Sequence, residues 1–258
     1  MIQREWKFYM IGRLICGDDC LAQIFKNKKP TNKFRYQIKA KNYDEGIKWG
    51  KICAFKVFNT TNFYSYKSNG LLNTIIKLKK KDVAFLLKNR FILLRKDFKK
   101  FKDNTALALL KNVPHKLILN FNDTQIGEFL AGIFDSDGTI RPSTEEMFVS
   151  LDSQLQTREE PLAYEQIRLF KSLAKMNKVP RILRIEVVHP PKEVNKAMKF
   201  FMKAKRIFPR VKIKKDNNSK GTKIYLFLSC NFQDELNRRS WKFWFKEVVP
   251  RLIREDKR

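Results

Sequence analysis

The predicted elements occur twice in the same order, and this duplication constrains the fold more than any other feature of the sequence. In the first half, apolar residues at helical spacing lead into residues 11–19, and strand-like stretches, a helix and a hairpin follow. In the second half, a helix with an N-cap signal ends in residues 129–138, and the same kinds of element follow it. Each half is therefore expected to contain a helix, two strands, a helix, two strands and a closing helix.

The stretches behind this pattern can be placed by residue number. In the first half they are strands at 21–25 and 34–39, helices near 44–58 and 82–94, and a hairpin over 62–78. In the second half they are strands at 139–141, 147–151, 181–188, 210–214 and 223–229, and helices near 162–176, 192–204 and 234–248. This order predicts an α+β fold of two pseudo-symmetric αββαββα repeats, the first in residues 1–115 and the second in residues 116–258.

Positive charge is spread along the whole chain. Its 258 residues include 55 Lys and Arg against 26 Asp and Glu, which gives a formal net charge of +29. Such an excess repels itself unless a polyanion is near, and each cation placed on a phosphate releases a condensed counterion. Because the charge extends from Lys7 to Arg258 and 43% of the residues are hydrophobic, we expect a folded nucleic-acid-binding protein rather than a disordered basic tail.

The sequence lacks the signals of a membrane or secreted protein. No apolar run approaches the ~20 residues that span a bilayer, so no membrane partner is expected. The first five residues, MIQRE, mix charges and do not form a secretory pattern. We therefore expect an intracellular protein, in the cytoplasm, the nucleoid or an organelle matrix.

Cysteine and histidine are too sparse for several other kinds of site. The two histidines are His115 and His189, and the four cysteines are Cys16, Cys20, Cys53 and Cys230. A structural zinc site needs four well-spaced ligands, and this sequence has no second close cysteine pair. The composition therefore argues against zinc, against a histidine-based nuclease and against a Ser-His-Asp hydrolase, and it favours reduced thiols.

One motif connects the duplication to a chemistry. Residues 129–138 read FLAGIFDSDG, which resembles the LAGLIDADG motif almost position for position. Residues 11–19, IGRLICGDD, form a weaker copy one repeat upstream. This copy keeps the apolar helix and the acid Asp18, but it has Arg13 opposite Gly132, Cys16 opposite Asp135 and Asp19 opposite Gly138.

The resemblance to the LAGLIDADG homing endonuclease family implies an arrangement for the two motif helices. They are expected to pack against each other on the pseudo-twofold axis, with Gly12, Cys16 and Gly17 facing Ala131, Gly132 and Ser136. Arg13 is expected either at the rim of this interface or, if it is not there, as a sign that the register of the weaker motif is off by one residue. The acids Asp18 and Asp137 are then the catalytic, metal-binding pair at the helix tips, and Mg²⁺ or another divalent cation suits their oxygen ligands. Such a chain is an intron-encoded, site-specific endonuclease of double-stranded DNA that supplies both sites as a monomer.

The same resemblance gives the strands a role in recognition. In the family, four antiparallel strands per repeat form a saddle over the major groove, which admits β-ribbons. Alternate strand residues then face the DNA while Tyr36 and Ile38 face the core. The predicted DNA-binding residues of the strands are Arg35, Gln37, Lys39, Ser150, Asp152, Gln154, Lys212 and Lys214. An ordinary solvated sheet face is the alternative for each of them.

Other lysines are expected to act on phosphates. Loop lysines such as Lys28 and Lys29 would add affinity without sequence specificity. The family places a basic residue near each scissile phosphate, and the matching segments of this chain point to Lys99 and Lys257 as catalytic lysines. Phosphate-binding or solvated lysines are the alternative for both positions.

Two other functions remain open from the sequence. A protein of the same fold that has lost cleavage, either an RNA intron maturase or a DNA-binding regulator, would explain the degenerate first motif and would bring intron RNA in as a partner. An unrelated basic RNA- or ribosome-binding protein would show no matched carboxylates at its centre. The sequence also lacks a Cys or Ser at position 1 and a terminal His-Asn, so a free-standing intron-encoded protein is expected rather than an intein.

Overall fold

The computed structural model describes most of the chain in nine segments. They are residues 3–27, 29–94, 107–141, 146–151, 162–180, 184–189, 210–215, 222–227 and 235–254. The predicted helix near 192–204 lies outside these residues. No helix in these segments is long and apolar enough to cross a membrane.

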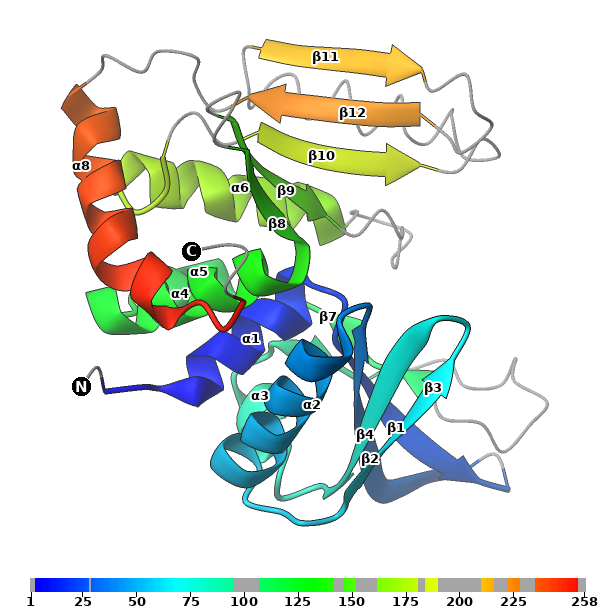
Figure 1. The fold of residues 1–258 in the computed structure, drawn as a ribbon. Coiled ribbons are helices and arrows are strands. Elements are labelled where there is room, and N and C mark those ends of the chain that lie inside the picture. The colour runs from blue at the N-terminus through cyan, green and yellow to red at the C-terminus, as the bar shows by residue number, and fades with distance from the viewer. Residues whose placement is uncertain are drawn as a thin grey trace.

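Two helices lie side by side at the centre of the molecule (Figure 1). They are α1 (Trp6–Cys16) and α5 (Asp123–Asp137). A Cβ added to Gly12 would overlap the carbonyl oxygen of Phe129, and one added to Gly132 would overlap that of Tyr9. The backbones therefore meet directly, because neither glycine has a side chain to hold them apart. The predicted central packing of the two motif helices is confirmed. Because Gly12 meets Phe129 as Gly132 meets Tyr9, Gly12 and not Arg13 is the counterpart of Gly132, so the register of the weaker motif is shifted by one residue here.

The start of α5 follows from its first residues. The Asn122 side chain accepts a hydrogen bond from the backbone N–H of Gln125, and the Gln125 side chain returns one to the backbone N–H of Asn122. This capping box satisfies two backbone donors that a helix end leaves open. Asp123 adds a negative charge in the first turn, where the helix dipole favours it. The predicted N-terminus of this helix is confirmed.

The first half forms a five-stranded sheet with helices on one face. Its strand order is β3-β4-β2-β1-β6, and every pair in it is antiparallel. The strands are β1 (Cys20–Lys26), β2 (Lys29–Ala40), β3 (Phe63–Ser68), β4 (Leu71–Lys79) and the short β6 (Leu107–Ala108). The helical elements are α2 (Tyr43–Ile52), the π-helical turn η1 (Cys53–Val57) and α3 (Ala84–Lys88). α2 packs against one face of β2 and β4, and no other described helix packs extensively on these strands, so the opposite face is called the open face.

Two predicted helices of the first half differ in detail from the structure. In place of the single helix expected near 44–58, the structure has α2 followed by the wider π-helical turn η1. The helix expected near 82–94 is only the short α3, because Arg90 has a φ of 57° that ends helical geometry. The chain then enters β5 (Ile92–Leu93), which pairs with β7 (Leu110–Lys111).

The second half also forms a five-stranded sheet, in the order β11-β12-β10-β9-β8. Its strands are β8 (Gly138–Arg141), β9 (Glu146–Leu151), β10 (Arg184–His189), β11 (Arg210–Lys215) and β12 (Thr222–Phe227). Its helical elements are α4 (His115–Leu119), α6 (Leu162–Lys175), α8 (Glu235–Phe243), the π-helical turn η4 (Trp244–Val248) and the 3₁₀ turn η5 (Val249–Arg251). α4 begins at the predicted boundary between the two repeats, where the sequence predicted no helix.

One strand of the second sheet corrects the expectation of four antiparallel strands. β10 lies between β9 and β12, and it runs parallel to β9. A parallel pair needs a crossover, and α6 supplies it between these two strands. In the first half the chain instead returns from α2 through the β3–β4 hairpin, so β4 meets β2 antiparallel. The α+β class holds, while the two sheets differ in topology.

Buried carboxylates tie both chain ends to α5. The side chain of Glu128 is fully buried, and it accepts hydrogen bonds from Arg4 Nε at 2.7 Å and from the backbone N–H of Glu5 at 3.1 Å. Asp135 accepts hydrogen bonds from the Tyr9 hydroxyl at 2.5 Å and from the backbone N–H of Ile253 at 2.6 Å. Burial raises the pKa of Asp135, and it also raises the pKa of Tyr9. Because a buried charge is costly without partners, these contacts fix the segments beside α5.

Gly132→Ala is expected to lower the free energy of unfolding by about 3 kcal/mol or more, because the new Cβ meets backbone that cannot move aside. This loss exceeds the gain of about 1 kcal/mol that alanine brings to a helix. Thermal unfolding followed by circular dichroism measures it. Gly46→Ala in α2 is the matched control, because its Cβ meets side-chain atoms of Ala40 at 2.8 Å and Leu72 at 2.9 Å. Equal losses for the two variants would contradict the argument.

Candidate active site

Two carboxylates meet where the central helices end. Asp137 is the last residue of α5, and Asp18 lies two residues beyond the end of α1. The backbone N–H of Asp18 donates to the Ser136 hydroxyl oxygen at 2.9 Å, which holds the two helix ends together. Both acids line one cavity of about 670 Å³. The structure thus brings together the predicted pair, one acid from each half.

The two acids differ in their surroundings. Asp18 is exposed, whereas Asp137 is largely enclosed. Burial raises the pKa of Asp137 to about 7, and the negative charge of Asp18 contributes in the same direction. A like charge nearby and low access to water both disfavour the ionised form. Two carboxylates held together in this way favour a cation between them, because a cation relieves their repulsion.

Arg13 does not lie at the rim of the helix interface, so that expectation was wrong. Its side chain is 3% exposed, and its Nε donates to Asp19 at 3.0 Å. Asp19 is fully buried and also accepts hydrogen bonds from the Tyr36 hydroxyl at 2.6 Å and from Trp49 Nε1 at 3.0 Å. Asp19, six residues further along the chain, therefore neutralises the charge of Arg13. Asp18 alone is left at the surface of this motif.

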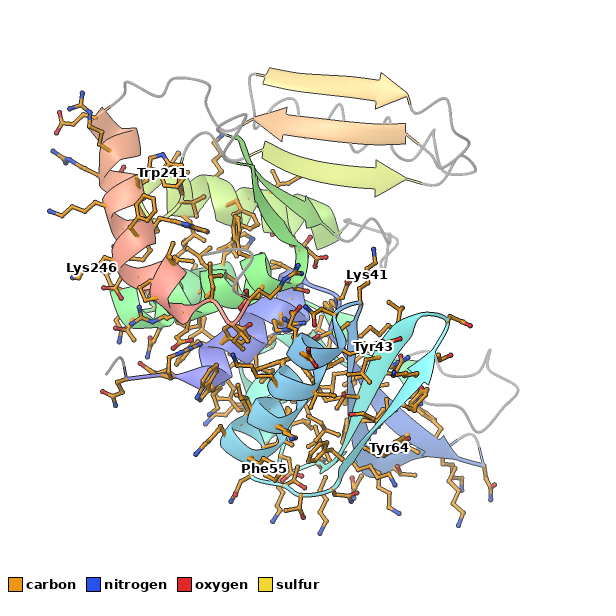
Figure 2. The ribbon with its side chains drawn as sticks, in the orientation of Figure 1. Lys41, Tyr43, Phe55, Tyr64, Trp241 and Lys246 are labelled. Atoms are coloured by element: carbon orange, nitrogen blue, oxygen red, sulfur yellow. The ribbon has the colours of Figure 1, made fainter. Side chains whose placement is uncertain are left out.

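Four positive residues also line the cavity. Arg13, Lys39, Lys41 and Arg254 line it together with the two acids. They come from α1, from β2, from the turn after β2 and from the segment after η5. Figure 2 labels Lys41, which lies near the gap between the two sheets. The cavity therefore offers cations for phosphate groups beside a carboxylate pair.

Three residues of this wall were missed by the sequence reasoning. Lys41 continues the two-residue alternation of 35, 37 and 39, so the pattern could have found it. Arg254 reaches the cavity through tertiary contacts, and its Nε lies 3.4 Å from Glu45 Oε2 of the other half. Glu45 also lies 3.5 Å from Arg13 Nη1. No local pattern in the sequence predicts contacts between residues so far apart in the chain.

Lys111 is a further lysine that the sequence did not indicate. Its Nζ donates a hydrogen bond to the carbonyl oxygen of Gly17 at 2.7 Å. Gly17 is the residue directly before Asp18. Its positive charge lowers the pKa of Asp137, although burial and Asp18 raise it more. It lies on the short strand β7, in a stretch that the sequence indicated as a connector.

The open face of the first sheet carries the residues that alternation predicted there. Tyr36 and Ile38 are buried on the helix side, so Arg35, Gln37 and Lys39 point to the other face. Gln37 Nε2 donates to Asn73 Oδ1 at 3.1 Å on the neighbouring strand. The alternation is confirmed, and the contact of these residues with DNA stays a prediction.

The other predicted DNA contacts are placed less completely. Lys29 is exposed at the start of β2. Ser150 lies in β9, and Lys212 and Lys214 lie in β11 at positions that share one face. The predicted residues Lys28, Lys99, Asp152, Gln154 and Lys257 lie outside the described residues.

Four acids line the cavity, and two of them are held by neighbouring groups. Glu45 pairs with Arg13 and Arg254, and Asp135 accepts hydrogen bonds from Tyr9 and Ile253, so Asp18 and Asp137 are the pair that could bind a metal. Within the segments that the structure describes, no group of three or more His, Cys, Asp or Glu is placed to hold a metal. Burial raises the pKa of the Cys16 thiol, which lies close to Asp137, and a thiol of raised pKa is a poor ligand and nucleophile. A cation at this site would therefore complete its shell with phosphate oxygens and water.

Asp137→Asn is expected to stabilise the metal-free protein at pH 8 and to leave its stability unchanged near pH 4. The pKa of Asp137 is about 7 in the folded chain against ~3.9 in an unfolded one. The stability that its neutral form contributes is thus complete below pH ~4 and is lost as the pH rises through 7. Asparagine stays neutral throughout.

Thermal unfolding in EDTA at both pH values measures the effect. Each kcal/mol of change in the free energy of unfolding should shift the unfolding midpoint by ~2–4 °C. Asp123→Asn is the control for the loss of a favourable charge: this exposed acid at the start of the same helix pairs with Lys178, so its replacement should not stabilise the protein at pH 8. If the wild type is as stable as Asp137→Asn at pH 8, ionisation of the Asp137 carboxyl group does not destabilise the folded protein, which contradicts the prediction.

Comparisons with known proteins place the chain beside one endonuclease. No family model and no curated protein matches the sequence. Among solved structures, it is similar to I-DmoI bound to its target DNA nicked in the coding strand with manganese present, at 12% identity and a TM-score of 0.42 over 96% of this chain and 97% of that one.

Two further I-DmoI structures are similar to the chain. Mesophilic variants of the homing endonuclease I-DmoI match at 12% identity and a TM-score of 0.42, over 94% of this chain and 89% of that one. I-DmoI with target DNA and magnesium matches at 11% identity and a TM-score of 0.40, over 95% of both chains. The three similarities extend over 94–96% of this chain.

Proposed function

We propose that this protein is a site-specific, intron-encoded homing endonuclease that hydrolyses phosphodiester bonds of double-stranded DNA with a divalent metal. The observation that carries the proposal is the meeting of Asp18 and Asp137 at the tips of two helices from different halves of the chain. A duplex cut requires chemistry on two strands. One chain with an acid from each half can serve both strands as a monomer, with its repeats divided near residue 115.

The residues of the site fit a hard divalent cation such as Mg²⁺. Asp18 and Asp137 supply carboxylate oxygens, and the repulsion between them gives a cation a reason to bind. When bound, the metal would polarise the phosphodiester and lower the pKa of the attacking water.

The chain's own residues position the acids. Ser136 holds the backbone of Asp18, and Arg13, Tyr36 and Trp49 keep Asp19 buried so that it does not compete for the cation.

Positive residues around the acids suit the DNA backbone. Lys39, Lys41 and Arg254 line the cavity, and Lys111 lies beside Gly17. They would hold phosphates next to the acids and offset the negative charge that gathers there. The roles proposed above for Lys99 and Lys257 belong to the same group of contacts.

The open sheet faces suit the bases. Arg and Gln are the residue types that pair with guanine and adenine edges in the major groove, and Arg35 and Gln37 lie on such a face. Lys29 and Lys28 at the β1–β2 turn would contact phosphates and fix the register of the sheet on the duplex. An enzyme of this kind acts on DNA inside the cell, in the cytoplasm, the nucleoid or an organelle matrix.

A cleavage-deficient nucleic-acid-binding protein is the second candidate, as an RNA intron maturase or a DNA-binding regulator. Arg13 is the observation that favours it, because its guanidinium lines the cavity that holds Asp18 and Asp137. Its positive charge lowers the pKa of Asp137 and opposes a cation at the same place. The cleavage experiment below separates this candidate from the endonuclease.

Asp18→Asn and Asp137→Asn are each expected to abolish duplex cleavage while DNA binding survives, because the sheets and lysines carry the affinity. The assay incubates the protein with Mg²⁺ and a plasmid library of candidate insertion sites, and maps the cut ends. Asp123→Asn is the matched control and keeps cleavage. Cleavage of both strands by Asp137→Asn at the wild-type rate would rule out the assignment. Tight binding without cleavage by the wild type would favour the regulator or maturase.

Affinity for duplex DNA is expected to fall steeply with salt. The logarithm of the association constant should drop by about 0.9 for each tenfold rise in salt per phosphate neutralised. Removal of a phosphate-binding lysine, as in Lys41→Ala, should reduce this slope by about 1. Fluorescence anisotropy of a labelled duplex across a salt series measures both quantities. A flat response would show that the charge of +29 is not used on DNA.

A further inference from the structure

Two exposed tyrosines lie on the outer strand of the first sheet. Tyr64 and Tyr66 on β3 are 48% and 44% exposed, which is unusual for side chains of this size. Their rings stack on each other with centroids 6.1 Å apart and an angle of 24° between planes. Figure 2 labels Tyr64 at the edge of this sheet. The pair forms a preordered aromatic surface, about half of which is exposed.

Strand register places this pair on the open face. Tyr64 is opposite Ile75 on β4, and Ile75 is opposite Gln37 on β2. Directly opposed residues of neighbouring strands point to the same side of a sheet. Tyr64 therefore shares the face of Gln37, which is the face turned away from the helices.

The strand register places Tyr66 on the same face as Tyr64. Tyr66 is opposite Asn73, and Asn73 is opposite Lys39. Both tyrosines thus lie on the face that is proposed to contact DNA.

The surroundings of the pair are basic and polar. Lys77 Nζ lies 5.3 Å from the centre of the Tyr64 ring, and Gln37 binds Asn73 on the adjoining strands. An apolar surface among such groups suits a polyanion that also presents apolar atoms. In the major groove of a DNA duplex the apolar group at the base edges is the C5-methyl of thymine, and the other bases present hydrogen-bonding edges there.

We propose that Tyr64 and Tyr66 recognise the methyl groups of thymines in the part of the target beneath β3, and so determine specificity there. The proposal rests on the proposed function, because it requires a duplex on the open face. Neighbouring strands are ~4.8 Å apart, so Tyr64 lies ~10 Å from Gln37. The thymines would then lie on the order of three base pairs from the base that Gln37 contacts, at ~3.4 Å per base pair.

Replacement of thymine by uracil removes only the methyl group, so it tests the proposal directly. The wild type first selects its preferred sequences from a randomised duplex library without Mg²⁺. Affinity is then measured for the selected duplex with thymines replaced one at a time by uracil. Two adjacent or near-adjacent thymines should each lose about three- to fivefold in affinity on replacement, the value for one buried methyl group.

Variants connect this effect to the two rings. The double variant Tyr64→Ala with Tyr66→Ala should lose uracil discrimination at those positions, whereas Tyr64→Phe with Tyr66→Phe should keep it. Phe55→Ala is the matched control, because Phe55 is also exposed at 46% but lies on η1, on the helix side of the sheet. It should discriminate as the wild type does, and circular dichroism checks that each variant is folded.

The outcomes separate this inference from the proposed function. A wild type that cleaves its selected site but binds uracil and thymine duplexes equally overturns the inference alone. Discrimination that survives in the double alanine variant, or that is lost in the phenylalanine variant, overturns it as well. Uracil discrimination without cleavage supports the inference and counts against the endonuclease. Failure to select any sequence overturns both.

Discussion

The close approach of α1 and α5 is the contact on which the rest of the structure depends. Gly12 and Gly132 allow each backbone to touch the other, so the helix ends come close enough for Asp18 to be held by Ser136. A side chain at either glycine would push the two helices apart and so increase the distance between the two acids. The position of the sheets follows from the same contact, because each sheet begins directly after its central helix.

The centre of the molecule balances charges that are individually unfavourable. Arg13 enters a helix interface that suits small residues, and Asp19 neutralises it with help from Tyr36 and Trp49. Asp137 instead keeps an unneutralised carboxyl group beside Asp18, with a pKa raised to about 7. Asp19, the next residue after Asp18, thus belongs to a completed network, whereas Asp137, which ends the other central helix, is a carboxyl group with a raised pKa. Shifted pKa values of this kind are common at functional sites, where a bound ligand can offset the unfavourable charge.

The sequence predicted best where the cause is local. The capping box at Asn122 and the alternation of Arg35 and Gln37 depend on residues within a few positions of each other, and both are observed. The pairing of Asp18 and Asp137 was predicted from the resemblance of the two motifs to the LAGLIDADG motif. The contact of Lys111 with Gly17 spans 94 residues, and no nearby pattern encodes it. The parallel pairing of β10 was missed for the same reason, because a crossover is decided by tertiary packing and not by strand pattern.

The extra strand β10 makes the two halves of this chain unequal surfaces. The second sheet inserts a parallel strand between β9 and β12, where the first sheet joins β2 directly to β4. A homodimer must present identical surfaces and is therefore matched to a palindrome. A single chain has no such obligation, and here the connection and direction of the strands already differ between its two sheets. A sequence read by both sheets would be asymmetric, so the protein could bind it in one orientation only, and each acid would always meet the same strand.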